Sequence, residues 1–199
     1  MTGPGSRAYV PGVGPGRPPW PYLLAIGLMI FGLPVVRSLE AQAKPTEYEV
    51  QAAYLANFGR FVEWPVRAGA GERDPFYICV LGQDPFGPLL DAALKGEAIG
   101  GAPMVAKRVA GVADAANCRI VYVNPSKDTP LRPLLAALAG SNVLTVGDVF
   151  DFTIQGGMIQ FVLDGNRVRF EINLAAARQA RLNLSSQLLK VAVAVRRTP

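Results

Sequence analysis

Histidine is absent from all 199 residues of this sequence. Without imidazole the chain cannot build a Ser-His-Asp or Cys-His catalytic site, or the imidazole zinc site that is common in proteins. Cysteine is nearly as scarce, since only Cys79 and Cys118 occur, and their separation lacks the Cys-x-x-Cys spacing of a metal or redox motif. These absences favour a protein that uses no metal, no cofactor and no nucleophilic catalysis.

Charge is also sparse, at 18% of the residues with a formal net charge of +5. The lysines and arginines are scattered, and no basic run is interleaved with aromatic residues. Nucleic acids bind to clustered positive surface, so a nucleic acid is a poor candidate partner. A phosphate loop is poorly supported too, because Pro88 follows Gly82–Gly87 where such a loop has lysine.

The most prominent apolar run, Tyr22–Val36, lies near the start of the chain. Two arginines precede it and the small-residue triplet Ala41–Ala43 follows, which is the pattern of a secretory signal. The run is shorter than the roughly 20 apolar residues of a membrane-spanning helix. We therefore expect residues 1–43 to be a signal peptide cleaved after Ala43, and residues 44–199 to be one exported domain. An uncleaved anchor helix is the alternative.

Apolar spacing and turn residues along the exported part predict alternating strands and helices. Thr46–Glu49 has the pattern of a capping box, and Asp164–Asn166 has that of a tight hairpin turn. The expected elements are a helix at 47–62, a strand at 76–81, a helix opened by Asp84 and Pro85, strands at 103–109 and 119–124, a helix opened by Thr129 and Pro130, a strand at 142–146, a short helix at 149–154, hairpin strands at 158–163 and 168–172, and helices at 174–181 and 186–195. This order predicts an α/β fold, a three-layer sandwich with a largely parallel central sheet, a C-terminal β-hairpin and flanking helices.

In an oxidising compartment, two cysteines in one small domain most simply pair. A bridge between Cys79 and Cys118 would stabilise the fold by roughly 4 kcal/mol in the chain-entropy model. Two buried free thiols are the alternative.

Three arginines are the most promising binding residues. Arg60, Arg169 and Arg178 lie near the first helix and the last hairpin, and guanidinium groups bind carboxylates and other anions bidentately. They form a candidate anion or ligand pocket; the interpretation that the sequence favours is solvated arginines paired with Glu63 or Glu171. The carboxylates that merit attention for acid–base chemistry are Asp148, Asp151, Asp164 and Glu171. No serine or threonine has an evident base beside it, so no catalytic residue is expected.

Six stretches, taken in order, resemble the YfiR family of exported α/β proteins over about residues 48–195. The stretches are Ala52–Phe58 with Phe61–Pro65, Ile78–Gly82 with Asp84–Phe86, Val143–Val146, Gly156–Ile159, Arg167–Asn173 and Ser185–Leu189.

The resemblance implies a periplasmic repressor that binds the periplasmic domain of an inner-membrane diguanylate cyclase and lowers cyclic-di-GMP signalling and biofilm growth. It also implies an outer-membrane lipoprotein that sequesters the repressor, a homodimer, and a disulfide that Cys79 and Cys118 match in placement. A second cysteine pair of the best-known member is missing, so control by a second bridge has no support here. A periplasmic binding protein for a small anion or other small molecule is the alternative function, and an enzyme with an unrecognised carboxylate site is a third.

Overall fold

The computed structural model describes Gly12 and residues 44–65 and 74–198. The chain divides into two units, Met1–Ala43 and Lys44–Pro199, and the fold described below is that of the second. The expected signal peptide and its cleavage site lie outside the described residues. Within the described ranges, no helix has the length and apolar character needed to cross a bilayer.

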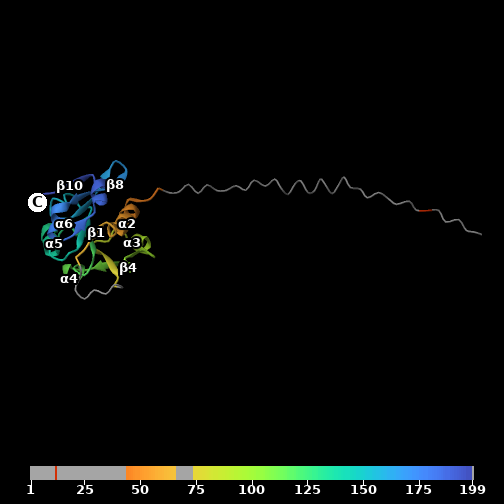
Figure 1. Ribbon diagram of the computed structural model, residues 1–199, viewed down its shortest axis with the longest axis horizontal. Helices are drawn as coiled ribbons and strands as arrows, with labels where there is room; N and C mark the ends of the chain where they lie inside the picture. Colours follow the sequence, from red (N-terminus) through yellow and green to blue (C-terminus); the bar gives the residue numbers. More distant parts are fainter. Residues whose placement is uncertain (1–11, 13–43, 66–73, 199) are drawn as a thin grey trace, which may run out of the picture. The chain divides into compact units, whose positions relative to one another are not determined.

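Strands and helices alternate along the described unit (Figure 1). In chain order they are α2 (Glu47–Phe58), β1 (Val62–Glu63), β2 (Phe76–Gly82), α3 (Pro88–Leu94), β3 (Ala98–Ile99), β4 (Ala102–Val109), α4 (Val112–Ala115), β5 (Ile120–Asn124), α5 (Leu131–Leu138), β6 (Leu144–Gly147), β7 (Ile159–Asp164), β8 (Arg167–Asn173), α6 (Leu174–Gln179), β9 (Asn183–Leu184), α7 (Ser186–Val191) and β10 (Ala194–Arg196). The main sheet has the order β10-β8-β7-β6-β5-β2-β4-β3, in which only the β3–β4 and β7–β8 pairs are antiparallel. The largely parallel sheet and the C-terminal hairpin are therefore confirmed.

The central strands carry apolar residues on both faces because helices cover both faces. In β2, Ile78 and Val80 belong to one buried cluster, whereas Cys79 and Leu81 belong to another. Helices α2, α3, α6 and α7 contribute to the first cluster, and α4 and α5 contribute to the second. The sheet is thus the middle layer of the predicted three-layer sandwich.

A disulfide joins Cys79 of β2 to Cys118, which lies just before β5. The two Cα atoms are 6.1 Å apart, and both residues are buried in the second cluster. The prediction of a bridge is confirmed, and the alternative of two free thiols is wrong.

Two local predictions are confirmed in detail. At the start of α2, the Thr46 backbone N–H donates to Glu49 Oε2 over 2.6 Å, and the Glu49 N–H donates to Thr46 Oγ1. The donation from the Thr46 backbone N–H, and secondarily that from the Thr46 hydroxyl to the same Oε2, lower the pKa of Glu49. At the hairpin, Asp164 pairs with Arg167 across a two-residue loop, and Gly165 has the positive φ of 60° that such a turn requires.

The first helix is shorter than predicted. It ends at Phe58 instead of Val62, since the chain turns through Gly59 and Arg60 and then forms β1. β1 pairs with β9, whose residues lie far along the chain, and that pairing has no signal in the local sequence.

The caps predicted for the next two helices are also wrong. α3 starts at Pro88 after Gly87, while the Asp84 carboxylate accepts from the backbone N–H groups of Phe86 and Gly87 and holds the preceding loop. α5 starts at Leu131 without a side-chain cap, and Thr129 instead hydrogen-bonds with Ser126.

Two helical predictions near the C-terminus fail. Residues 149–154 form a series of turns, because Asp151 has a positive φ of 58° that a right-handed helix does not allow. The last helix ends at Val191, since Ala192 is extended and β10 follows. Ser185 is the N-cap of that helix, and its Oγ accepts from the Leu188 N–H.

Candidate binding groove

Hydrogen bonds cross the usual ligand site of this sheet type. In an open parallel sheet, ligands bind outside the carboxyl ends of the strands where the strand order reverses, which here is between β2 and β5. The Gln83 N–H donates to the Asn124 carbonyl over 2.8 Å, and Asn124 Nδ2 donates back to the Gln83 carbonyl over 3.1 Å. A Cβ on Gly82 would come within 2.1 Å of the Asn124 oxygen. The ends of the two strands are therefore joined closely at this point.

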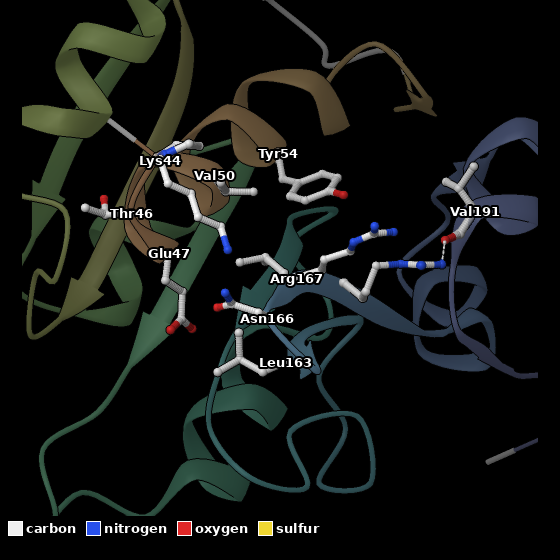
Figure 2. A pocket seen from close by; sticks show the side chains of 12 residues that line it. Lys44, Thr46, Glu47, Val50, Tyr54, Leu163, Asn166, Arg167 and Val191 are labelled. Atoms are coloured by element: carbon white, nitrogen blue, oxygen red, sulfur yellow. Dashed lines mark hydrogen bonds between the residues drawn. The ribbon is translucent and has the colours of Figure 1, made fainter. Parts of the chain in front are cut away.

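A groove of about 790 Å³ lies instead beside β8, near the β10 edge of the sheet (Figure 2). We call it the cationic groove. Its lining residues come from the start of α2, the β7–β8 hairpin and the end of α7; they are Lys44, Pro45, Thr46, Glu47, Val50, Tyr54, Leu163, Asn166, Arg167, Val168, Arg169 and Val191. Its charged side chains are three cations and one carboxylate, so it favours an anionic or acidic occupant.

The β8 strand places two of these cations. Arg167 and Arg169 alternate with Val168 and Phe170, which point into the first core cluster. Strand β10 pairs with β8 only from Glu171 onward, so the first half of β8 has no strand on that side within the described residues. The groove occupies this position.

Residues of α2 and α7 line the groove together with the β7–β8 hairpin. The Tyr54 ring packs edge-on against Phe170, with ring centroids 5.4 Å apart, and its partly exposed ring faces the groove (Figure 2). Arg169 Nη2 donates to the Val191 carbonyl over 3.4 Å, which ties the β8 side chain to the end of α7. Lys44 reaches into the space between α2 and the hairpin.

Large apolar side chains lie exposed around the same groove. Leu163 at the hairpin is 60% exposed, and Val191 is 56% exposed. Both line the groove, which therefore combines cations with an exposed apolar rim. This combination fits contact with a protein surface or with an amphipathic anion.

The structure does not bring the three predicted arginines into this groove together. Arg169 lines it, whereas Arg60 forms an ion pair with Glu97, next to β3 at the opposite edge of the sheet. Arg178 lies exposed on α6 and does not line the groove. Glu63, one of the carboxylates considered as an arginine partner, accepts from Asn183 Nδ2 in the β1–β9 ribbon.

The candidate acid–base carboxylates lie elsewhere. None of Asp148, Asp151 or Glu171 lines the cationic groove, and no group of three or more Cys, Asp or Glu residues in the described ranges is placed to hold a metal ion. Burial, and secondarily the charge of Asp148, raise the pKa of Tyr122 above the ordinary tyrosine value. The Tyr122 phenol is therefore neutral near pH 7 and is not poised as a base.

Sequence reasoning missed most of the groove. Lys44, Glu47, Tyr54 and Arg167 belong to it, and only Arg169 was among the predicted binding residues. The alternation of Arg167 and Arg169 with apolar residues is a signal that both arginines share one face of a strand. The meeting of that strand with the start of α2 depends on tertiary packing, for which the local sequence offers no signal.

Comparison with family models gives a match over most of the chain. A family model described as YfiR/HmsC-like matches residues 48–193. No curated protein matches the sequence.

Among solved structures, a conserved domain protein from Vibrio cholerae O1 biovar eltor str. N16961 is similar with a TM-score of 0.53 and 12% identity, covering 77% of this chain and 62% of that chain. This chain thus spans less than two thirds of that relative's length, and the likeness shows the fold alone. The ABC domain in complex with L-Trp from Streptococcus pneumonia matches at 14% identity over 60% of this chain and 54% of that one; its TM-score of 0.40 supports no inference.

Proposed function

This chain belongs to the YfiR/HmsC-like family, and from that membership we propose that it is an exported, non-catalytic regulator in the periplasm. It binds the periplasmic domain of an inner-membrane diguanylate cyclase, restrains the enzyme and lowers cyclic-di-GMP. A regulator of this kind acts through a contact surface and requires no reactive group.

The structural observation that supports this proposal is the cationic groove with its exposed apolar rim. Leu163 and Val191 leave apolar surface in solvent beside Arg167 and Arg169. Apolar centres flanked by arginine are typical of protein interfaces.

The test is genetic and biochemical. Deletion of the gene should raise cellular cyclic-di-GMP, and the wild-type gene should restore the lower level. A Leu163→Glu variant should fold normally, fail to restore it and fail to co-purify with the cyclase. A Val105→Glu variant is the control, since Val105 is also partly exposed but lies on β4, far along the sheet order. Unchanged cyclic-di-GMP on deletion would contradict the proposal.

One observation favours a second function, the binding of a small anion. Lys44, Arg167 and Arg169 line one concave site against the single carboxylate of Glu47. Isothermal titration with inorganic phosphate and with benzoate tests it, and Arg169→Gln should weaken binding at least tenfold. Arg60→Gln and Arg178→Gln are matched controls that should leave affinity unchanged, because neither residue lines the groove. Absence of measurable heat with both anions rejects this function.

A further inference from the structure

The loop between β6 and β7, residues 148–157, holds two large apolar side chains in solvent. Phe150 is 82% exposed and Ile154 is 50% exposed. Among the large hydrophobic residues described, none is more exposed than Phe150. Isolated exposed apolar residues are ordinary, but these two flank a segment that is firmly built into the fold.

The segment is anchored by Phe152, whose side chain is fully buried in the second core cluster. Its ring lies against two glycines, since a Cβ at Gly157 would come within 2.1 Å of the ring and one at Gly147 within 2.7 Å. Backbone hydrogen bonds close the turns, including the Gly157 N–H to the Phe152 carbonyl over 2.9 Å. The exposed side chains are therefore presented by a fixed backbone.

A buried polar network ties the same loop to the start of α6. The Thr153 N–H donates to Gln160 Oε1 over 3.1 Å, and Asn173 Nδ2 donates to the Thr153 carbonyl over 2.9 Å. Asn173 is also the N-cap of α6, with its Oδ1 accepting from the Ala176 N–H. One side chain thus sets the position of the loop against the helix.

Between this loop and helices α5 and α6 lies a second groove, of about 970 Å³, which we call the α5–α6 groove. Its lining residues are Arg132, Leu135, Ala136, Ala139, Ile154, Gln155, Gly156, Asn173, Ala175, Ala176 and Gln179. Four of its eleven lining residues are alanines, and Ile154 lines it from the loop. Gln155 Nε2 donates to the Phe150 carbonyl over 3.2 Å, so Phe150 adjoins a groove-lining residue. The α5–α6 groove shares no lining residue with the cationic groove.

Charge indicates what fits this surface. Arg132 is exposed and supplies the only charge among the lining residues, which favours an occupant with a carboxylate. Asp148 and Asp151 flank Phe150 in the sequence and disfavour insertion of that ring into an anionic lipid surface. A protein with an apolar patch beside an aspartate or glutamate satisfies both conditions.

We propose that Phe150, Ile154 and the α5–α6 groove form a second docking surface, which binds a partner protein that offers an apolar patch flanked by a carboxylate. Phe150 is the anchor, and Arg132 pairs with the partner's acid. Because the backbone of the loop is already fixed, little ordering entropy is lost on binding. This surface lies apart from the cationic groove, and its test does not depend on the identity of the cyclase.

The experiment uses the full chain, produced in the cells from which it derives, with the photo-reactive substitution Phe150→benzoylphenylalanine. Irradiation should yield a discrete protein adduct, and mass spectrometry should locate the cross-link in a peptide that contains apolar residues and at least one aspartate or glutamate. A second substitution, Arg132→Glu, should lower the adduct yield at least tenfold. Arg178→Glu is the matched control, because Arg178 is exposed on α6 but does not line the groove. Val105→benzoylphenylalanine controls for non-specific capture.

The melting temperature of each variant is measured, so that a folding defect is separated from loss of contact. A tenfold loss with Arg132→Glu but not with Arg178→Glu supports the proposal. An adduct to lipid alone, to a second copy of this chain, or to none at all overturns it. A protein adduct whose yield is the same in the Arg132→Glu and Arg178→Glu backgrounds overturns it as well.

Discussion

The glycine at position 157 should be essential to the packing of the loop between β6 and β7. An ideal Cβ at Gly157 would come within 2.1 Å of two atoms of the Phe152 ring, well inside van der Waals contact. The ring is fully buried and is held on another side by Gly147, so it has no free space into which to move. Gly157→Ala should therefore lower the free energy of unfolding by about 3 kcal/mol, the upper end for overpacking a core.

That loss corresponds to a fall of about 6–12 °C in melting temperature for a domain of this size. The cause can be isolated with a double-mutant cycle. Phe152→Ala alone should cost about 3–5 kcal/mol because it empties a buried site. In that background Gly157→Ala should cost almost nothing, since the ring that it strikes is gone, which gives a coupling energy of about 2–3 kcal/mol.

Urea unfolding, followed by fluorescence with the disulfide intact, measures all three variants, and a constant m-value shows that the midpoint reports stability. Gly140→Ala is the control, because no atom lies within 4 Å of its added Cβ; its effect should stay within about 0.5 kcal/mol. If Gly157→Ala matches this control, or if its effect adds fully to that of Phe152→Ala, the reasoning about the ring and the glycine is wrong.

Three further predictions address other parts of the fold. Cys79→Ser removes the bridge to Cys118 and should cost about 4 kcal/mol on the chain-entropy model, measured by urea unfolding; equal midpoints for the wild type with and without reductant would contradict it. Tyr122→Phe should cost less than about 1 kcal/mol at pH 7, since the buried hydroxyl lies near the Asp148 carboxylate but makes no hydrogen bond of normal geometry with the described residues. Because the pKa of folded Tyr122 is raised, the phenol of the unfolded chain ionises first as the pH rises. The contribution of Tyr122 to the free energy of unfolding is therefore complete below pH 10 and is lost above it. Between pH 10 and 11 the wild type should therefore lose up to about 1.4 kcal/mol per pH unit more than Tyr122→Phe, and parallel urea midpoints would refute this. Thr46→Ala, which removes the capping box of α2, should cost about 1 kcal/mol in a thermal melt, whereas Thr129→Ala, which removes no helix cap, should cost less.

Features of this fold that depend on neighbouring residues could be predicted from the sequence. The capping box of α2 forms because Thr46 and Glu49 meet within one turn of helix. The hairpin turn forms because Gly165 tolerates a positive φ. The parallel sheet follows from unbroken apolar runs, which are typical of strands covered on both faces.

Features that depend on contacts between residues far apart in the chain could not be predicted from the sequence. Strand β1 exists only because β9 pairs with it, and β10 replaces the end of a predicted helix because it adds to β8. The same limit applied to the predicted pocket. Arg60, Arg169 and Arg178 were grouped because they lie near the first helix and the last hairpin, yet Arg60 and Arg169 lie toward opposite edges of the sheet.

The two grooves share a physical property that bears on how this molecule binds. The walls of the cationic groove are joined by the contact between Arg169 and the Val191 carbonyl, and those of the α5–α6 groove by Asn173, which both caps α6 and holds Thr153. A surface whose walls are fixed before binding loses little conformational entropy when a partner arrives, so more of the apolar contact energy appears as affinity. Loosening a wall should therefore weaken binding by more than the loss of the surface that the substituted side chain exposes. Asn173→Ala is the sharpest case, because Asn173 is buried and its side chain joins the loop to α6.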